Sequence, residues 1–349
     1  MIPPTDLRGR SLLAVFAHPD DESITCGGLL AWCAHLGADV ALLCLTHGEH
    51  GQNGGAHDPG GREPGGGGGG LGPGESAHGQ DGGHPAPRAA DLASTRRREL
   101  DGAARALGVK TVTLLHHEDG MLPWLEAARL EADVVAAIRR QRPDAVITFD
   151  EDGVYGHPDH VAVHERTTAA VAALGDGAPA LYYVTIPPGA MRAVADHAAR
   201  RKREGMDGPL WERPPEEGGP ESRGDRLAPP TSHPGENART SILGVRDPDA
   251  FGAEAPAPTL VVDAGAFASA KLAALACHAT QFRGGALEAV APEDAPRLLG
   301  IEHYRRARAG AAGPSVLDAF ASSPAVAFAA ARPSSPSDGS SGVGRRRTP

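Results

Sequence analysis

Two short polar segments hold the residue types from which hydrolytic metal sites are built. Residues 18–22 read His-Pro-Asp-Asp-Glu and directly follow the apolar run 12–17. Residues 157–160 read His-Pro-Asp-His and follow a second apolar run, 145–149, after a short loop. Because open α/β sheets place their chemistry at the carboxyl ends of the strands, we expect the two segments to meet there.

The spacing within these segments predicts a zinc site. His18 and Asp21 lie three residues apart on a tight turn, so both side chains can converge on one ion, and His160 supplies a third ligand. Catalytic zinc sites take three such protein ligands and keep one position open. Asp20 is then free to act as the general base on the activated water.

His157 is the candidate for stabilising negative charge on the substrate. It precedes His160 by three residues and can face the same cavity. The neighbouring carboxylate of Asp159 favours the protonated form of His157, because an opposite charge nearby favours the charged form of a group. A protonated His157 would stabilise an oxyanion and protonate a leaving amine.

Each of these residues alone has an ordinary structural explanation. An aspartate after a strand, such as Asp21 or Asp159, is often a helix N-cap, and a lone histidine is usually surface or hydrogen-bonded filler. Two such segments, each at a strand end, favour a functional site. Gly27 and Gly28 do not form the GxGxxG spacing, and acidic residues occupy the turn, so a dinucleotide site is only a weak alternative.

The composition excludes several classes of protein. The chain has 349 residues, a net charge of −10 and a pI of about 5.9, which argues against a general nucleic-acid binder. Its four cysteines show no CxxC spacing and predict core residues rather than disulfides. The N-terminus lacks a signal-peptide pattern, and no apolar run reaches about 18 residues, so we expect a cytoplasmic protein without a membrane span.

Strand and helix patterns alternate and predict a Rossmann-like α/β fold, with a mostly parallel sheet and helices on both faces. The expected strands are 12–17, 39–46, 111–116, 145–149, 181–186 and 259–262. The expected helices are 24–36, 90–107, 125–141, 159–173, 189–203 and 264–280, with one more inside 292–308. We expect one domain over 1–332, with low-complexity insertions at about 48–87 and 205–258, and a disordered tail over 333–349.

The two polar segments resemble the two signatures of the LmbE-like, or PIG-L-type, zinc N-deacetylases, in the same order. The resemblance covers roughly residues 10–48, 90–200 and 259–308. It implies a Rossmann-like fold, a mononuclear Zn²⁺ site and the removal of an N-acyl group, usually acetyl, from a small amino-sugar substrate. The same ligand types would also accept Fe²⁺.

The resemblance implies a role for each matching residue. His18, Asp21 and His160 become metal ligands, Asp20 becomes the base, and His157 becomes the acid and oxyanion stabiliser oriented by Asp159. Tyr155 helps to polarise the substrate carbonyl. Arg96 contacts substrate hydroxyls, and Glu118 or Asp119 holds hydroxyls of the sugar.

Two C-terminal segments indicate a subgroup. Residues 271–281 and 302–304 resemble segments of the mycothiol-pathway deacetylases, which act on N-acetylglucosaminyl-inositol. Three alternatives remain open: a mycothiol S-conjugate amidase, a deacetylase of a glycosylated natural product, and a non-catalytic sugar-binding module. The last predicts a missing ligand or base, and none is missing.

Overall fold

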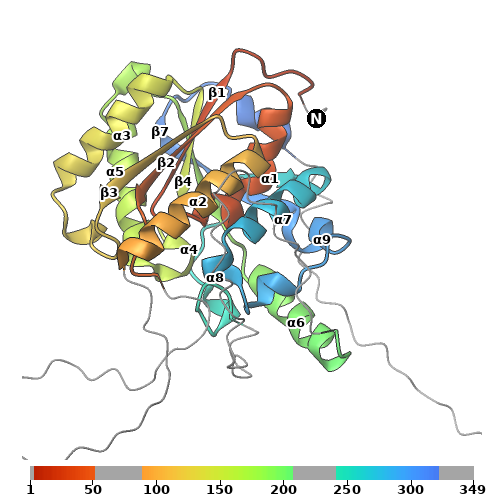
Figure 1. The fold of residues 1–349 in the computed structure, drawn as a ribbon. Helices are drawn as coiled ribbons and strands as arrows, with labels where there is room; N and C mark the ends of the chain where they lie inside the picture. The colour runs from red at the N-terminus through yellow and green to blue at the C-terminus, as the bar shows by residue number, and fades with distance from the viewer. Residues whose placement is uncertain (1–3, 52–88, 207–240, 322–349) are drawn as a thin grey trace, which may run out of the picture.

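The computed structural model describes residues 4–51, 89–206 and 241–321. Most of the two predicted insertions and the whole predicted tail over 333–349 therefore lie outside the described residues. Within the described part, the helices and strands pack around one sheet (Figure 1). The prediction of a single domain over 1–332 stays a prediction.

Seven strands form the sheet in the order β3-β2-β1-β4-β5-β7-β6. The first five in this order run parallel, and β7 is antiparallel to both β5 and β6. The bounds are β1 Ser11–Phe16, β2 Asp39–Thr46, β3 Thr111–His117, β4 Ala145–Phe149, β5 Ala180–Thr185, β6 Leu260–Asp263 and β7 Ile301–Gly310. The predicted mostly parallel α/β sheet is confirmed.

Helices cover both faces of this sheet. Figure 1 shows α3 and α5 on one side, and α1, α2 and α7 on the other. The α-helices are α1 Asp21–His35, α2 Ala89–Leu107, α3 Ala127–Gln141, α4 Gly153–Gly156, α5 Pro158–Ala172, α6 Ala190–Arg203, α7 Ala268–Cys277, α8 Ala279–Phe282 and α9 Ala295–Leu299. Short 3₁₀ turns are η1 Leu122–Trp124, η2 Gly175–Gly177, η4 Pro248–Ala250, η5 Gly265–Phe267, η6 Ala286–Ala289 and η7 Val316–Phe320.

The central strands read as continuous apolar runs because both of their faces are covered. All five residues of β4 and all but the first of β1 are buried. Helix α3 instead buries a single stripe, formed by Leu130, Val134, Ala137 and Ile138 at helical spacing. Each large apolar side chain fully buried in this way contributes about 1.5–3 kcal/mol. The rigid layers hold the ends of β1 and β4 in fixed positions.

In the C-terminal half the structure confirms one expected helix, adds a strand and corrects one expectation. The helix expected inside 292–308 is α9, and strand β7, which the sequence did not predict, follows it, with Glu302 and Tyr304 buried. Pairing with β5 and β6 decides the conformation of residues 301–310. The described end of the second expected insertion also packs in the core, since Ile242 is 1% and Phe251 0% exposed.

Two smaller predictions concern the cysteines and the membrane. All four cysteines are free thiols, and Cys26, Cys33 and Cys44 are buried, as expected of core residues. Among the described residues, no helix combines the length and the apolar character needed to cross a bilayer.

Candidate active site

The turn after β1 and the start of α5 meet, as the sequence predicts. His18 and Asp21 lie at the junction of β1 and α1, and His160 lies in the first turn of α5. All three side chains are at least nine-tenths buried. The Nδ1 atom of His18 lies 3.2 Å from Nε2 of His160, although 142 positions separate the two residues in the chain.

Three donor groups face one another at this junction. His18 Nδ1 lies 3.6 Å from one carboxylate oxygen of Asp21, and His160 Nε2 lies 3.3 Å from the other. With the 3.2 Å between the two imidazole nitrogens, these distances bring both rings and the Asp21 carboxylate together around one point. Tetrahedral zinc with bonds of about 2.0–2.1 Å requires ligand atoms roughly 3.3 Å apart. The donor set therefore fits such an ion without rearrangement.

The remaining ring nitrogens are engaged in a way that fixes both tautomers. His160 Nδ1 lies 3.2 Å from the carbonyl oxygen of Gly153, so this nitrogen carries the proton and donates it. His18 Nε2 lies 2.9 Å from a carboxylate oxygen of Asp119, which likewise requires a donor. Metal-binding histidines almost always donate their second N–H to a carbonyl or a carboxylate. In its neutral form, each ring thus has its lone pair on the nitrogen that faces the other ring and Asp21.

Two lone pairs 3.2 Å apart repel each other unless a cation lies between them. Burial lowers the pKa of His160 to about 3, so this ring is neutral and able to bind a metal. Burial opposes protonation of His18, yet the hydrogen bonds that its ring donates to Asp119 and Asp159 raise its pKa well above the ordinary value. A proton between the rings satisfies both lone pairs in the same position that a metal would occupy.

A second group of possible ligand atoms lies behind the His18 ring. His18 Nε2, Asp119 and Asp159 are mutually within 4.8 Å. Asp159, however, already accepts hydrogen bonds from the backbone N–H groups of Gly120 at 2.8 Å and Leu122 at 3.1 Å. Asp119 also accepts one from the N–H of His50. Among the described residues, His18, His157 and His160 also lie close enough together to hold a metal ion, so a His and Asp cluster here could hold one.

Asp20 lies beside the three donors in a buried and polar environment. Burial is the main reason that its pKa is raised to about 7, and the neighbouring Asp21 adds to the rise. Arg96 opposes it, because a guanidinium nitrogen lies 3.1 Å from the Asp20 carboxylate. A general base is most effective when its pKa lies near the working pH.

Arg96, expected to contact substrate hydroxyls, is only 2% exposed. Besides Asp20, its guanidinium donates to the carbonyl oxygens of Pro19 at 2.7 Å and Gly48 at 2.6 Å. In this structure the Arg96 side chain therefore supports the turn that carries Asp20. Of the three consecutive arginines at 96–98, it is the one that reaches the site.

His157 lies at the same cavity but differs from the expectation that Asp159 keeps it protonated. Burial, and then the charge of His18, lower the pKa of His157 below its ordinary value. The backbone N–H of Asp159 donates to His157 Nδ1 at 3.2 Å, so the ring proton lies on Nε2. The Asp159 carboxylate instead contacts His18 and the backbone near η1. His157 is thus a neutral N–H donor.

Tyr155 lies against His157 and His160 at the start of α5. Its ring centroid is 5.7 Å from that of His157 and 5.4 Å from that of His160. Phe251 packs on it at 5.0 Å, and burial raises the pKa of its hydroxyl far above the ordinary value. The preceding Val154 has φ of 71°, a conformation that a β-branched residue adopts only when its surroundings impose it.

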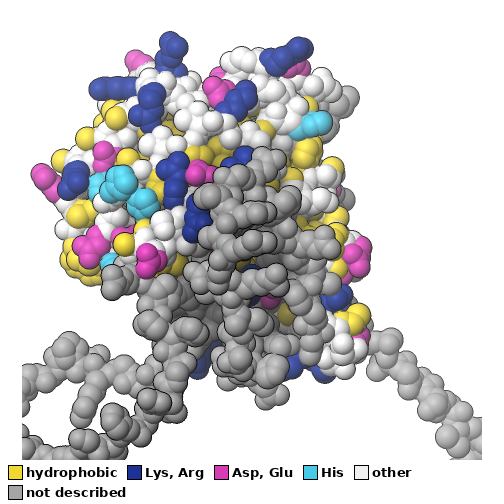
Figure 2. Space-filling view, viewed as in Figure 1, with side chains coloured by type: hydrophobic (Ala, Val, Ile, Leu, Met, Phe, Trp, Pro, Cys, Tyr) yellow, Lys and Arg dark blue, Asp and Glu magenta, His cyan; other side chains and the backbone are white. Residues whose placement is uncertain are grey.

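The two acidic candidates for sugar hydroxyls lie in different environments. Glu118 is exposed, whereas Asp119 is 7% exposed and is engaged with His18 and His50. A histidine pair marks the nearby strand ends, with His47 Nε2 2.8 Å from His116 Nδ1. Figure 2 shows histidine side chains gathered on the surface where β3 runs in Figure 1.

Sequence reasoning missed two buried residues that touch the site. Glu22 accepts the backbone N–H of Asp20 at 3.1 Å, and His278 lies 2.8 Å from Glu22. Glu22 stood inside the first polar segment and could have been singled out by position. His278 lies in segment 271–281, which carries part of the family resemblance, but no spacing links it to Glu22, 256 residues away.

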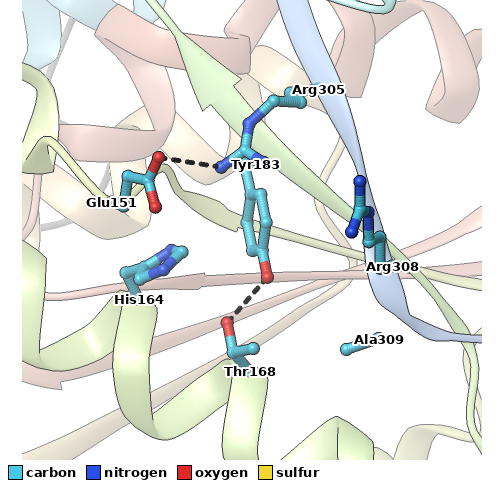
Figure 3. Close-up of a pocket in the computed structure, with 7 residues that line it drawn as sticks. All are labelled: Glu151, His164, Thr168, Tyr183, Arg305, Arg308 and Ala309. Carbon is cyan, nitrogen blue, oxygen red and sulfur yellow. Dashed lines mark hydrogen bonds and ion pairs between the residues drawn. The ribbon is translucent and has the colours of Figure 1, made fainter. Parts of the chain in front are cut away.

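A separate pocket opens between α5, β5 and β7 and contains none of the predicted site residues (Figure 3). Its volume is about 450 Å³, and it is lined by Glu151, His164, Thr168, Tyr183, Arg305, Arg308 and Ala309. The Arg305 guanidinium lies over the Tyr183 ring, and its Nε donates to buried Asp150 at 2.9 Å. This ion pair fastens the start of the loop that leads to Tyr155 and His157.

Comparison with known proteins places this geometry in a family. The sequence profile described as PIG-L: GlcNAc-PI de-N-acetylase matches residues 13–171, which include both polar segments. A 1D-myo-inositol 2-acetamido-2-deoxy-alpha-D-glucopyranoside deacetylase of Rhodococcus jostii is 33% identical over 334 residues, covering 87% of this chain and 93% of the relative. The enzyme of the same name from Acidothermus cellulolyticus is 31% identical over 314 residues, covering 84% and 88%.

A solved structure also resembles the fold. The 4-carboxy-2-hydroxymuconate hydratase GalB of Pseudomonas putida is 16% identical, with a TM-score of 0.48 over 87% of this chain and 99% of that one. This similarity is too low to carry any conclusion about the reaction.

Proposed function

The chain belongs to the PIG-L family of GlcNAc-PI de-N-acetylases, and on that premise we propose that it removes the acetyl group from N-acetylglucosaminyl-inositol, a step of mycothiol biosynthesis. The observation that supports this most is the meeting of His18 Nδ1, Asp21 and His160 Nε2 beside buried Asp20. Both relatives, matched over 93% and 88% of their length, carry the name of that deacetylase.

His18, Asp21 and His160 are the residues that would hold the metal, and we propose Zn²⁺, with Fe²⁺ as the alternative for these ligand types. A metal held there supplies Lewis-acid activation of water and of the amide carbonyl. The hydrogen bonds from His18 to Asp119 and from His160 to Gly153 orient the two rings for this task.

The remaining residues divide the proton chemistry between them. Asp20 takes a proton from the attacking water as its oxygen bonds to the amide carbon. His157 donates its Nε2–H to the resulting oxyanion, and Tyr155 lies next to it. The proton on Asp20 then passes to the amide nitrogen as the C–N bond breaks, which releases acetate and a free amine. Glu118 and Asp119 stay candidates for contacts with the sugar hydroxyls.

The substrate is tested with the zinc-loaded full chain and N-acetylglucosaminyl-inositol, with free amine followed by mass spectrometry. We expect release by the wild type, and a loss of roughly 10²–10⁴-fold in Asp20→Asn at unchanged zinc content. Asp39→Asn, an exposed acid at the opposite end of β2, is the matched control and should retain activity. Full activity of metal-loaded Asp20→Asn would exclude Asp20 as the base.

The ligand assignment is tested by metal content alone. We expect His160→Ala to lose stoichiometric zinc after dialysis against a weak chelator, because two remaining ligands hold the ion poorly. His164→Ala, one turn further along α5, should keep it, since His164 Nδ1 contacts the Phe149 carbonyl instead. Unchanged zinc in His160→Ala would refute the assignment. Release from an S-conjugate or a glycosylated natural product, but not from N-acetylglucosaminyl-inositol, would replace the proposed substrate.

A further inference from the structure

The peptide unit that joins Pro19 to Asp20 is held at both of its polar ends by buried charged side chains. Arg96 donates to the carbonyl oxygen of Pro19 at 2.7 Å, and the N–H of Asp20 donates to Glu22 Oε2 at 3.1 Å. Asp20 itself has φ of 129° and ψ of −27°, outside the conformations that residues with a side chain favour. A residue held in such a region persists only where its surroundings impose the geometry.

Glu22 imposes part of this geometry and is itself fixed in place. The side chain is 1% exposed. Its Oε1 accepts a hydrogen bond from the Ser23 hydroxyl at 2.6 Å and lies 2.8 Å from Nε2 of His278. One carboxylate oxygen is therefore occupied by distant and local donors, which leaves the other directed at the N–H of Asp20.

His278 is the distant donor, and nothing else in the described part of the chain explains its polarity. The residue joins α7 to α8 and is 0% exposed. Its Nδ1 is buried and has no hydrogen-bond partner among the described residues. The unsatisfied nitrogen is a cost that an apolar side chain of similar size would avoid, so the contact with Glu22 is what the imidazole contributes here.

From this chain of contacts we propose that His278, acting through Glu22, is a positioning residue that holds the backbone of the catalytic base Asp20. The inference rests on the proposed function for Asp20. Neither Glu22 nor His278 touches the three metal-binding atoms, so their contribution is to the placement of Asp20 relative to the attacking water. A base must lie within about 2.6–3.2 Å of the proton it takes, and a displacement of about 1 Å can lower the rate roughly 100-fold.

The competing explanation is that His278 only fastens α7 and α8 to the sheet. The two explanations differ in what changes on substitution. An anchor changes stability, whereas a positioning residue changes kcat of the folded enzyme and leaves KM and metal content unaltered. They also differ in rescue, because glutamine can place a neutral N–H near the position of His278 Nε2, and leucine cannot.

The test compares His278→Leu, His278→Gln and His197→Leu in the full zinc-loaded chain. His197 is the matched control, because it is also a buried histidine and lies 3.5 Å from an acid, Asp294. It belongs to α6, which is remote from Asp20 (Figure 1). We expect His278→Leu to lose roughly 10–100-fold in kcat at wild-type KM and zinc content. His278→Gln should recover most of the loss, and His197→Leu should lose stability only.

Crystal structures of the wild type and His278→Leu provide a readout that does not depend on activity. We expect Asp20 to leave its positive φ, or its carboxylate to move, in the variant alone. An unmoved Asp20 with unchanged kcat would overturn the inference, as would equal losses in His278→Leu and His197→Leu. Absence of deacetylation by the wild type would instead refute the proposed function, and the Asp20 geometry would still decide the inference.

Discussion

Asp119→Asn separates two roles for this acid that predict opposite kinetic changes. In the structure, the Asp119 carboxylate lies 2.9 Å from His18 Nε2, on the side of the ring remote from Asp21. An amide of the same shape can still accept this hydrogen bond but loses the negative charge that makes the ring a better ligand. Outer-shell partners of this kind typically change metal affinity 10–100-fold, or about 1.4–2.7 kcal/mol.

The measurement is a competition between the protein and a chromophoric zinc chelator, followed by kinetics at saturating zinc. We expect Asp119→Asn to bind zinc roughly 10–100-fold more weakly. Once zinc is saturating, KM should stay close to that of the wild type. Glu118→Gln is the matched control, because it removes the neighbouring charge from an exposed position that has no contact with His18.

The alternative role, implied by the resemblance, is that Asp119 holds hydroxyls of the sugar. That role predicts unchanged zinc affinity and a raised KM in Asp119→Asn. Such a result would refute the outer-shell argument and return Asp119 to the substrate. A raised KM in Glu118→Gln alone would assign the sugar contact to the exposed acid.

Two further predictions concern stability. Lys271 Nζ lies 2.7 Å from the carboxylate of Glu302, and both residues are buried. Lys271→Met should therefore lower the free energy of unfolding in urea by about 3–5 kcal/mol. Arg297→Ala, which breaks the exposed pair with Asp294, should lower it by about 0–1 kcal/mol. Equal losses would contradict the role of burial. Burial lowers the pKa of His278, but Glu22 outweighs burial and holds this pKa above its ordinary value. The stabilisation of the fold by the His278–Glu22 pair is therefore complete below about pH 6.5 and is lost as pH rises through the folded pKa. The advantage of metal-free wild type over His278→Gln should thus be larger near pH 6 than near pH 9, and a constant difference would refute the linkage.

The sequence predicts those helices and strands in which the burial of each face follows a simple pattern along the chain. Strand β4 is buried on both faces and reads as a continuous apolar run, and α3 shows a stripe at helical spacing. Strand β7 was not predicted because polar residues fill most of its positions. Glu302 is buried with Tyr304, and Arg305 and Arg306 form ion pairs with Asp150 and Asp318. A strand defined by such long-range partners has no apolar alternation to find.

The same distinction explains which parts of the active site were predictable. Candidate ligands such as His18, Asp21 and His160 show a spacing that a single ion requires, so two short segments suffice to indicate them. Asp119 and His278 satisfy no spacing, because each acts through one contact made across the fold. Their effect on the chemistry is nevertheless direct: one sets the charge behind a metal-binding ring, and the other fixes the carboxylate that holds the base. The sequence therefore indicates which groups can react, and distant buried contacts determine how firmly those groups are placed.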